Sequence, residues 1–299
     1  MRTTVKPIEH DYFTTRDEIY SLLGKYPFLQ IEKIGKSTWG KELLALRIGK
    51  RQNYVLYTAA FHGMERLSAA VCLRFVEQVC HAIMVGGEVA GISARRAFSD
   101  RGLIVVPLVN PDGVDIAIHG EKACMDNGRV KRLCSGHFEI WNANARGVDI
   151  NHNFDANWHR LRELEKEAGI FGPAPTRYGG SSPHSEAETL ALTRLCAKTH
   201  FSHVVALHTQ GEVIYWNYGK NTPERAKRMA KIMSASSGYA LEEPMGLSSM
   251  GGFKDWFIDK YSRPGFTIEL GKGKNPLPAD RLDDIYTRVE EMLMLALVM

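Results

Sequence analysis

The sequence predicts an α/β protein whose mixed, largely parallel sheet is covered by helices on both faces. Short apolar runs alternate along the chain with longer segments of helical periodicity, a pattern typical of such sheets. The composition agrees, because 44% hydrophobic and 24% charged residues in a chain of 299 are ordinary values for a large globular domain. No repeat, low-complexity tract or linker divides the sequence, so we expect a single domain over 1–299.

The first elements are predicted to be a helix and a pair of strands. An amphipathic pattern predicts a helix over 15–23, with Thr15 as its N-terminal cap. Two apolar runs follow over 29–35 and 42–49, separated by a short turn. Because so short a connection joins antiparallel neighbours, these two strands should pair in that direction.

The rest of the chain alternates between strand and helix. Strands are predicted at the apolar runs 54–60, 103–109, 201–208 and 265–270. Helices are predicted over about 65–84, 185–199, 223–237 and 281–298. The turn residues of 110–113 predict a loop, and the charged run 160–167 is interpreted as a solvated helix face or loop.

The stretch His62-Gly63-Met64-Glu65 carries the strongest chemical signal. It follows directly on an apolar run, and it places an imidazole and a carboxylate three residues apart. A catalytic Zn²⁺ site takes two imidazole nitrogens and one carboxylate and keeps a fourth position open, so this stretch supplies two of the three ligands. The alternative for these residues alone is an exposed turn.

Two later runs supply the missing partners. The run 201–208 ends in His208, and the run 265–270 contains Glu269 among apolar neighbours. Since ligands and metals bind at the carboxyl ends of parallel strands, His208 is predicted as the third ligand of one Zn²⁺ ion. Burial would raise the pKa of Glu269, as a general base requires, although a solvated edge-strand carboxylate is the alternative. His200 and His203 enter the same strand and should lie at its other end.

The order of these motifs along the chain resembles the zinc carboxypeptidase family. The resemblance runs from about residue 10 to the end, and within the family it is strongest to bacterial γ-D-glutamyl-L-diamino-acid peptidases, which cut the peptide stems of the cell wall. The residues that carry it are His62, Glu65, 110–113, 141–154, 178–180, 185–188, His208, 251–257 and 267–269. It implies a zinc peptidase fold and muropeptide or stem-peptide substrates.

The departures from the family pattern concern the groups that bind substrate. Where digestive members carry Asn-Arg for a C-terminal carboxylate, this chain has Asn151-His152, so the bidentate guanidinium is missing. The family's oxyanion arginine falls near Asn142, and its flexible-loop tyrosine falls near Leu247. The oxyanion would then be met by the ion and a neutral donor, or by a cation from elsewhere such as Arg146.

The implied mechanism is metal-assisted amide hydrolysis. The ion would lower the pKa of a water molecule from about 16 towards 7, and Glu269 would accept its proton and pass it to the leaving amine. Asn151 and His152 would orient the charged groups beside the scissile bond. Lys254 precedes a position where the family reads the substrate side chain, or is a surface lysine. Asp149 would accept a hydrogen bond from a ligand imidazole, or is a buried structural carboxylate.

Two other functions stay open at this stage. One is an ordinary metallocarboxypeptidase that removes C-terminal residues, and the other is a non-catalytic binding module of the same fold. The small net charge of +4, without a dominant basic run, disfavours nucleic acid as a partner. No stretch has the roughly 20 apolar residues of a membrane span, and the N-terminus lacks a signal-peptide core. These features, with five cysteines that suit free thiols, predict a cytoplasmic protein.

Overall fold

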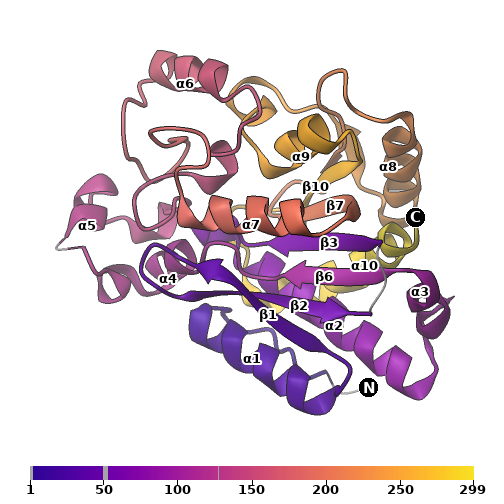
Figure 1. Cartoon of the computed structure of the whole chain (residues 1–299). Helices are drawn as coiled ribbons and strands as arrows, with labels where there is room; N and C mark the ends of the chain where they lie inside the picture. The colour runs from indigo at the N-terminus through magenta and orange to yellow at the C-terminus, as the bar shows by residue number, and fades with distance from the viewer. Residues whose placement is uncertain (1–2, 50–52, 127) are drawn as a thin grey trace.

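An eight-stranded mixed sheet runs through the centre of the computed structural model, which describes residues 3–49, 53–126 and 128–299 (Figure 1). Its strand order is β1-β2-β6-β3-β7-β10-β8-β9, and the four central strands β6, β3, β7 and β10 are parallel. The strands are β1 (Gln30–Lys36), β2 (Glu42–Ile48), β3 (Tyr54–Ala59), β6 (Gly102–Val106), β7 (Phe201–His208), β8 (Val213–Tyr215), β9 (Ala240–Glu242) and β10 (Gly265–Glu269). A separate hairpin consists of β4 (Glu88–Val89) and β5 (Ile92–Ser93).

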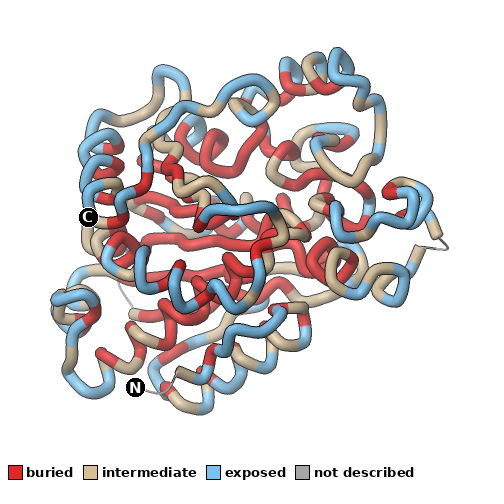
Figure 2. Tube along the Cα trace, turned by 180° about the vertical axis from the view of Figure 1, so that it is seen from behind, coloured by how far each residue is buried: buried red, intermediate tan, exposed pale blue. Residues whose placement is uncertain are grey.

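Helices cover both faces of this sheet, as the sequence predicts. One face packs against α1 (Tyr12–Lys25), α2 (Leu67–Val85), α8 (Glu224–Ser237) and α10 (Leu282–Val298). The other face packs against α7 (Ala187–Lys198) and α9 (Phe253–Tyr261). Successive residues of β3 and β6 alternate between the two cores, so these two strands are buried throughout, whereas Thr267 and Glu269 of β10 are half-buried. The centre of the sheet is largely buried (Figure 2).

Shorter helical segments connect these layers. The α-helices are α3 (Ala94–Asp100), α4 (Pro111–His119), α5 (Arg129–Leu133) and α6 (Trp158–Glu167). The 3₁₀ turns are η1 (Gly63–Glu65), η2 (Gly120–Ala123), η3 (Phe138–Ile140), η4 (Ile150–His152), η5 (Gly246–Ser249) and η6 (Ala279–Arg281). Segments between α4 and α7 supply several residues of the candidate site described below.

The first predicted elements are confirmed, with one correction. Strands β1 and β2 pair antiparallel. Helix α1, however, begins before Thr15, because Asp11 is its cap and accepts a hydrogen bond from the Thr14 amide at 2.7 Å. The Thr15 side chain is buried against the core instead.

The prediction of a loop at 110–113 is wrong. Helix α4 begins at Pro111, and Asn110 caps it by accepting a hydrogen bond from the Gly113 amide at 2.9 Å. Asn and Pro are turn residues, but they are equally the residues that open a helix. The turn residues therefore mark a helix start here.

The charged run 160–167 forms most of α6, and the prediction of a solvated face holds only in part. Glu165 has no exposed surface, whereas Glu163 and Glu167 are exposed. The Glu165 carboxylate pairs with Arg162 and accepts a hydrogen bond from the Gly179 amide. The charged run 160–167 thus contains one buried carboxylate, Glu165, with a structural role, although every charged position of the run looks solvated in the sequence.

Helix α2 belongs to a segment, Gly63–Val85, that is long and apolar enough to cross a membrane by length and composition. Yet 72% of its most apolar window is buried within the protein, as a core helix of a soluble fold would be. The five cysteines are free thiols. The cytoplasmic location stays a prediction.

Candidate active site

Parallel strands β3, β7 and β10 bring the predicted site residues to one edge of the sheet. His208 is the last residue of β7 and lies opposite Glu269, the last residue of β10. The preceding residue, Leu207, lies opposite Ala59 at the end of β3. Because all three strands run the same way, their carboxyl ends meet, and the residues that follow them share one space.

The turn that leaves β3 is held in an unusual conformation. Ala60 has φ of +52°, in the left-handed region that residues with a Cβ rarely adopt. Gly63 is required three residues later, because a Cβ there would lie 2.3 Å from the main-chain oxygens of Gly113 and Trp141. The Asn110 amide donates to the carbonyl of Phe61 at 2.9 Å. These contacts fix the direction in which His62 leaves the strand.

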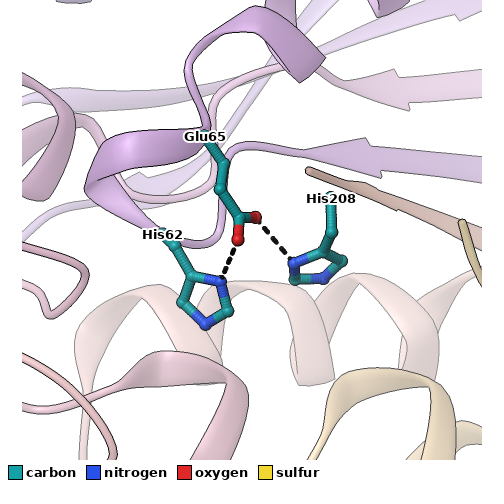
Figure 3. A group of neighbouring side chains, drawn as sticks. All are labelled: His62, Glu65 and His208. Carbon is teal, nitrogen blue, oxygen red and sulfur yellow. Dashed lines mark hydrogen bonds and ion pairs between the residues drawn. The ribbon is translucent and has the colours of Figure 1, made fainter. Parts of the chain in front are cut away.

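His62, Glu65 and His208 converge on one point (Figure 3). The Nδ1 atom of His62 lies 2.9 Å from Glu65 Oε1, and the Nδ1 atom of His208 lies 2.8 Å from Glu65 Oε2. The three donor atoms lie within 4.8 Å of one another, and the Glu65 and His208 side chains are almost fully buried. Two imidazoles and one carboxylate at this spacing match the donor set of a catalytic zinc site.

Asp149 makes the contact that its sequence position predicts. Its Oδ1 lies 3.1 Å from His62 Nε2, on the side of the ring away from Glu65. A carboxylate there holds the proton on Nε2 and leaves Nδ1 to bind a metal. The Asp149 carboxylate also accepts hydrogen bonds from the amides of Asn151 and Arg177, which hold it in place.

The His62, Glu65 and Asp149 side chains stabilise one another in their charged forms. Burial alone would lower the pKa of His62, but the charges of Glu65 and Asp149 outweigh it and raise that pKa well above its usual value. Burial would raise the pKa of Glu65, yet His62 and His208 hold it at about 2. Burial opposes ionisation of Asp149 as well, and the neighbouring His62 keeps its pKa far below normal. The cluster attracts positive charge, as a cation site must.

A second group of possible ligands, Asp11, Asp115 and His119, is taken up by protein contacts. Asp11 caps α1, and its other oxygen lies 2.8 Å from His119 Nε2. Asp115 pairs with Lys41 at 2.6 Å and accepts from a backbone amide. These partners already satisfy the group, so it carries no metal assignment.

Glu269 stands beside the three donors without joining them. Within the described ranges its carboxylate has no hydrogen bond or ion pair, and it faces the same cavity as His62 and Glu65. Burial raises its pKa well above the usual value, with a further contribution from the Glu65 charge. A free carboxylate with a raised pKa next to a cation site is suited to accept a proton near neutral pH.

A cavity of about 460 Å³ opens over these residues. Asn142, Asn151, His152 and Lys254, all predicted from sequence, line it. Arg146 does not: it lies outside the lining residues, and its guanidinium is 3.7 Å from Glu186. The structure therefore gives no support to Arg146 as an oxyanion or substrate group.

The Lys254 side chain is buried, which excludes the surface-lysine alternative. It is 4% exposed, its Nζ donates to the carbonyl of Asn217 at 3.0 Å, and it forms an ion pair with Asp255. Burial raises the pKa of Asp255, against the opposing effect of Lys254. The two side chains place a buried ion pair on the wall of the cavity.

Some cavity residues were not identified from sequence. The undetected lining residues include Thr176, Arg177, Tyr215, Pro244, Met245 and Met250. Leu247, expected at the flexible-loop position, lines the cavity together with its neighbours in 244–250. Tyr215 lies in β8, a strand that the sequence analysis did not predict, and Arg177 carries no motif that marks it.

Comparison with known proteins identifies the family. The family model described as zinc carboxypeptidase matches residues 16–292. The chain belongs to the zinc carboxypeptidase family. Members of this family are metallopeptidases, so the protein is a zinc-dependent hydrolase, and His62, Glu65 and His208 form the site that can hold its ion. The interpretation as a non-catalytic module is thereby set aside.

Particular relatives refine this placement. The chain is 36% identical over 283 residues to γ-D-glutamyl-L-diamino acid endopeptidase 1 of Lysinibacillus sphaericus, covering 93% of this chain and 69% of that protein. It is 33% identical over 293 residues to protein YqgT of Bacillus subtilis, covering 96% and 77%. The fold matches bovine thrombin-activatable fibrinolysis inhibitor with a TM-score of 0.76 at 20% identity, over 98% of this chain and 96% of that one.

Proposed function

We propose that this zinc peptidase hydrolyses the bond between the γ-carboxyl of D-glutamate and a diamino acid, diaminopimelate or lysine, in bacterial cell-wall peptides. The observation that carries the proposal is the altered carboxylate site. His152 replaces the guanidinium of digestive members and lies buried in the cavity. The 36% identity to an enzyme named for this bond supports the same substrate class.

The catalytic groups act around one carbonyl carbon. When bound, Zn²⁺ supplies Lewis-acid polarisation and lowers the pKa of a water molecule towards about 7. His62, Glu65 and His208 would hold the ion, and Asp149 orients the His62 ring. Glu269 accepts a proton from the attacking water and returns it to the leaving amine, which its raised pKa favours.

Asn142 is the candidate for stabilising the oxyanion. Its backbone is fixed, because its amide donates to the carbonyl of Pro175 at 2.9 Å and its carbonyl accepts from Gly63 at 3.1 Å. Its side-chain Oδ1 is buried and lacks a hydrogen-bond partner within the described part of the chain. Its Nδ2 group, for which the described residues provide no acceptor either, can donate to a negative charge that develops in the cavity.

Asn151, His152 and the Lys254–Asp255 pair are the candidate substrate contacts. The Asn151 Oδ1 accepts from the Phe253 amide at 3.0 Å, which leaves its NH₂ group for the substrate. A buried ion pair on the cavity wall offers one positive and one negative group to a charged side chain. A diamino acid carries a charged side-chain group that can contact this pair, whereas an apolar C-terminal residue has no such group.

The test is a digest followed by mass spectrometry. Purified enzyme is incubated with L-Ala-γ-D-Glu-diamino-acid peptides and, separately, with a standard peptide that ends in an ordinary C-terminal residue. We expect release of the free diamino acid from the first, little cleavage of the second, and loss of activity with a chelator. Preferential trimming of the standard peptide would instead identify an ordinary metallocarboxypeptidase.

A further inference from the structure

The charges that line the cavity leave one cation without a carboxylate partner. Four carboxylates line it, those of Glu65, Asp149, Asp255 and Glu269. Lys254 is paired with Asp255. A substrate carboxylate that enters this acidic cavity needs a cation that is not already engaged, since an unpaired anion there would be repelled and poorly solvated.

His152 does not provide that cation. Its Nδ1 lies 3.1 Å from the main-chain oxygen of Arg177, and a carbonyl oxygen only accepts, so Nδ1 carries the proton. The same nitrogen lies 3.1 Å from the buried Glu165 carboxylate, which holds the ring in place. Burial lowers the pKa of His152, against the opposing effect of the Asp149 charge. The proton-bearing nitrogen of His152 is therefore already engaged by acceptors of the protein itself.

Arg177 has the properties that His152 lacks. Its side chain lines the cavity and is exposed, and among the described residues it forms no ion pair. A guanidinium stays charged at every physiological pH and offers parallel donors that match a carboxylate. Arg177 therefore offers the cavity a guanidinium that no carboxylate of the described residues engages.

The backbone holds Arg177 in a conformation that costs free energy. Its φ is +66°, in the left-handed region, where a residue with a Cβ is strained. Two hydrogen bonds stabilise it there: its amide donates to Asp149 Oδ2 at 2.9 Å, and its carbonyl accepts from His152. The next residue, Tyr178, accepts from the Asp149 amide at 2.8 Å. The Cα of Arg177 is thus fixed against the segment that orients the zinc ligand His62.

The geometry points to Arg177 as the residue that binds the carboxylate of the amino acid released by cleavage. This inference rests on the proposed function for the identity of that amino acid. The chain carries its carboxylate-binding guanidinium on the loop that bonds to His152, in place of the one that digestive members carry at position 152. Because it is bonded to the 149–152 segment, we assign it to the leaving-group side of the scissile bond.

The test compares substrates with and without the carboxylate in wild-type and variant enzymes. Two L-Ala-γ-D-Glu-diamino-acid peptides are used, one with a free α-carboxylate on the diamino acid and one with a carboxamide. Arg177→Gly removes the side chain and suits a positive φ, so it avoids the strain that Arg177→Ala would keep. Wild type should favour the acid by about 10- to 100-fold in kcat/KM, mainly through KM, as expected for a hydrogen bond to a charged group. Arg177→Gly should lose this preference.

Two control variants and a second pair of peptides accompany this comparison. Arg177→Lys keeps the charge without the fork and should retain part of the preference, whereas Arg228→Ala, on the exposed face of α8, should leave it unchanged. A second pair of peptides changes the α-carboxylate of D-glutamate to an amide, and Arg177→Gly should not alter that ratio. Melting curves check that each variant is folded.

Three outcomes would overturn the assignment. One is an Arg177→Gly enzyme that keeps the acid preference. A second is an equal fall in kcat for acid and amide, which would indicate a role at the oxyanion. A third is dependence on the D-glutamate carboxylate instead. If wild type cuts only ordinary peptides, the proposed function fails, yet the same acid and amide comparison on such a peptide still decides the role of Arg177.

Discussion

Strand β7 carries a buried histidine near each end, and the two differ in their contacts and in their chemical role. His203, near the start, has no exposed surface, and His208, at the end, is 2% exposed. The side chain of His203 points towards α10, where its Nε2 lies 2.7 Å from the carbonyl of Ala296. His208 lies on the opposite face, stacked on Phe61, because side chains of a strand alternate.

The neighbours decide what each ring does. Ser202 and a carbonyl occupy the two ring nitrogens of His203, and burial lowers its pKa to about 3, so it is a neutral structural group. The Nδ1 of His208 faces the Glu65 carboxylate. Burial alone thus does not make a metal ligand, whereas a carboxylate and a second imidazole at the same sheet edge do.

The largest contrast is expected from removing each histidine in turn. His208→Ala should lose zinc and at least about 10³-fold in activity, since the ion contributes several kcal/mol to the reaction. His203→Ala should keep zinc and activity but lose about 2–4 kcal/mol of stability through the cavity it leaves. Metal analysis and urea unfolding measure both. A folded His203→Ala protein without zinc would contradict the comparison.

A substitution at Glu269 should separate the binding of zinc from its use in catalysis. Glu269→Gln keeps the size of the side chain but removes the proton acceptor, so kcat should fall by about 10²–10⁴-fold. The zinc content should stay at the wild-type value, because Glu269 lies outside the group of donors. Steady-state kinetics and metal analysis on one preparation test this, and full turnover by the variant would refute the assigned role.

A smaller effect is expected at the residue that orients His62. Asp149→Asn preserves the shape but removes the charge beside His62 Nε2, and zinc should bind about 10- to 100-fold more weakly. Competition with a chelator measures the affinity. Asp11→Asn, in the second acidic group, is the matched control and should leave zinc affinity unchanged. Equal weakening in both variants would indicate a general loss of charge.

The smallest effect concerns pH and stability at the other end of β7. The folded pKa of His203, about 3, lies below its unfolded value, so its stabilisation is complete above pH 6.5 and is lost as pH falls towards 3. Between pH 7 and 5, wild type should lose about 1–2 kcal/mol more than His203→Gln, which does not titrate. Urea unfolding of both proteins at each pH provides the difference. Parallel pH profiles would show that His203 is not buried as a neutral ring.

Much of the fold was predictable because strands and helices leave local periodic patterns. The central strands and the helices α2, α7, α8 and α10 all lie where apolar periodicity places them. The errors at 110–113 and at Glu165 share one cause. A turn residue and a charged residue have more than one structural role, and the choice depends on partners distant in the sequence.

The sequence by itself determined the metal site, because His62 and Glu65 share one short turn and His208 ends a strand, so that the rules of parallel sheets bring them together. Only the tertiary structure decided the charge and reach of the groups around it. In the folded protein Glu165 is buried against His152, and Lys254 forms an ion pair with Asp255. Arg177 lies at the cavity. The physical reason is that ligand spacing is a local property of the chain, whereas protonation and pairing depend on burial and on neighbours that folding alone supplies.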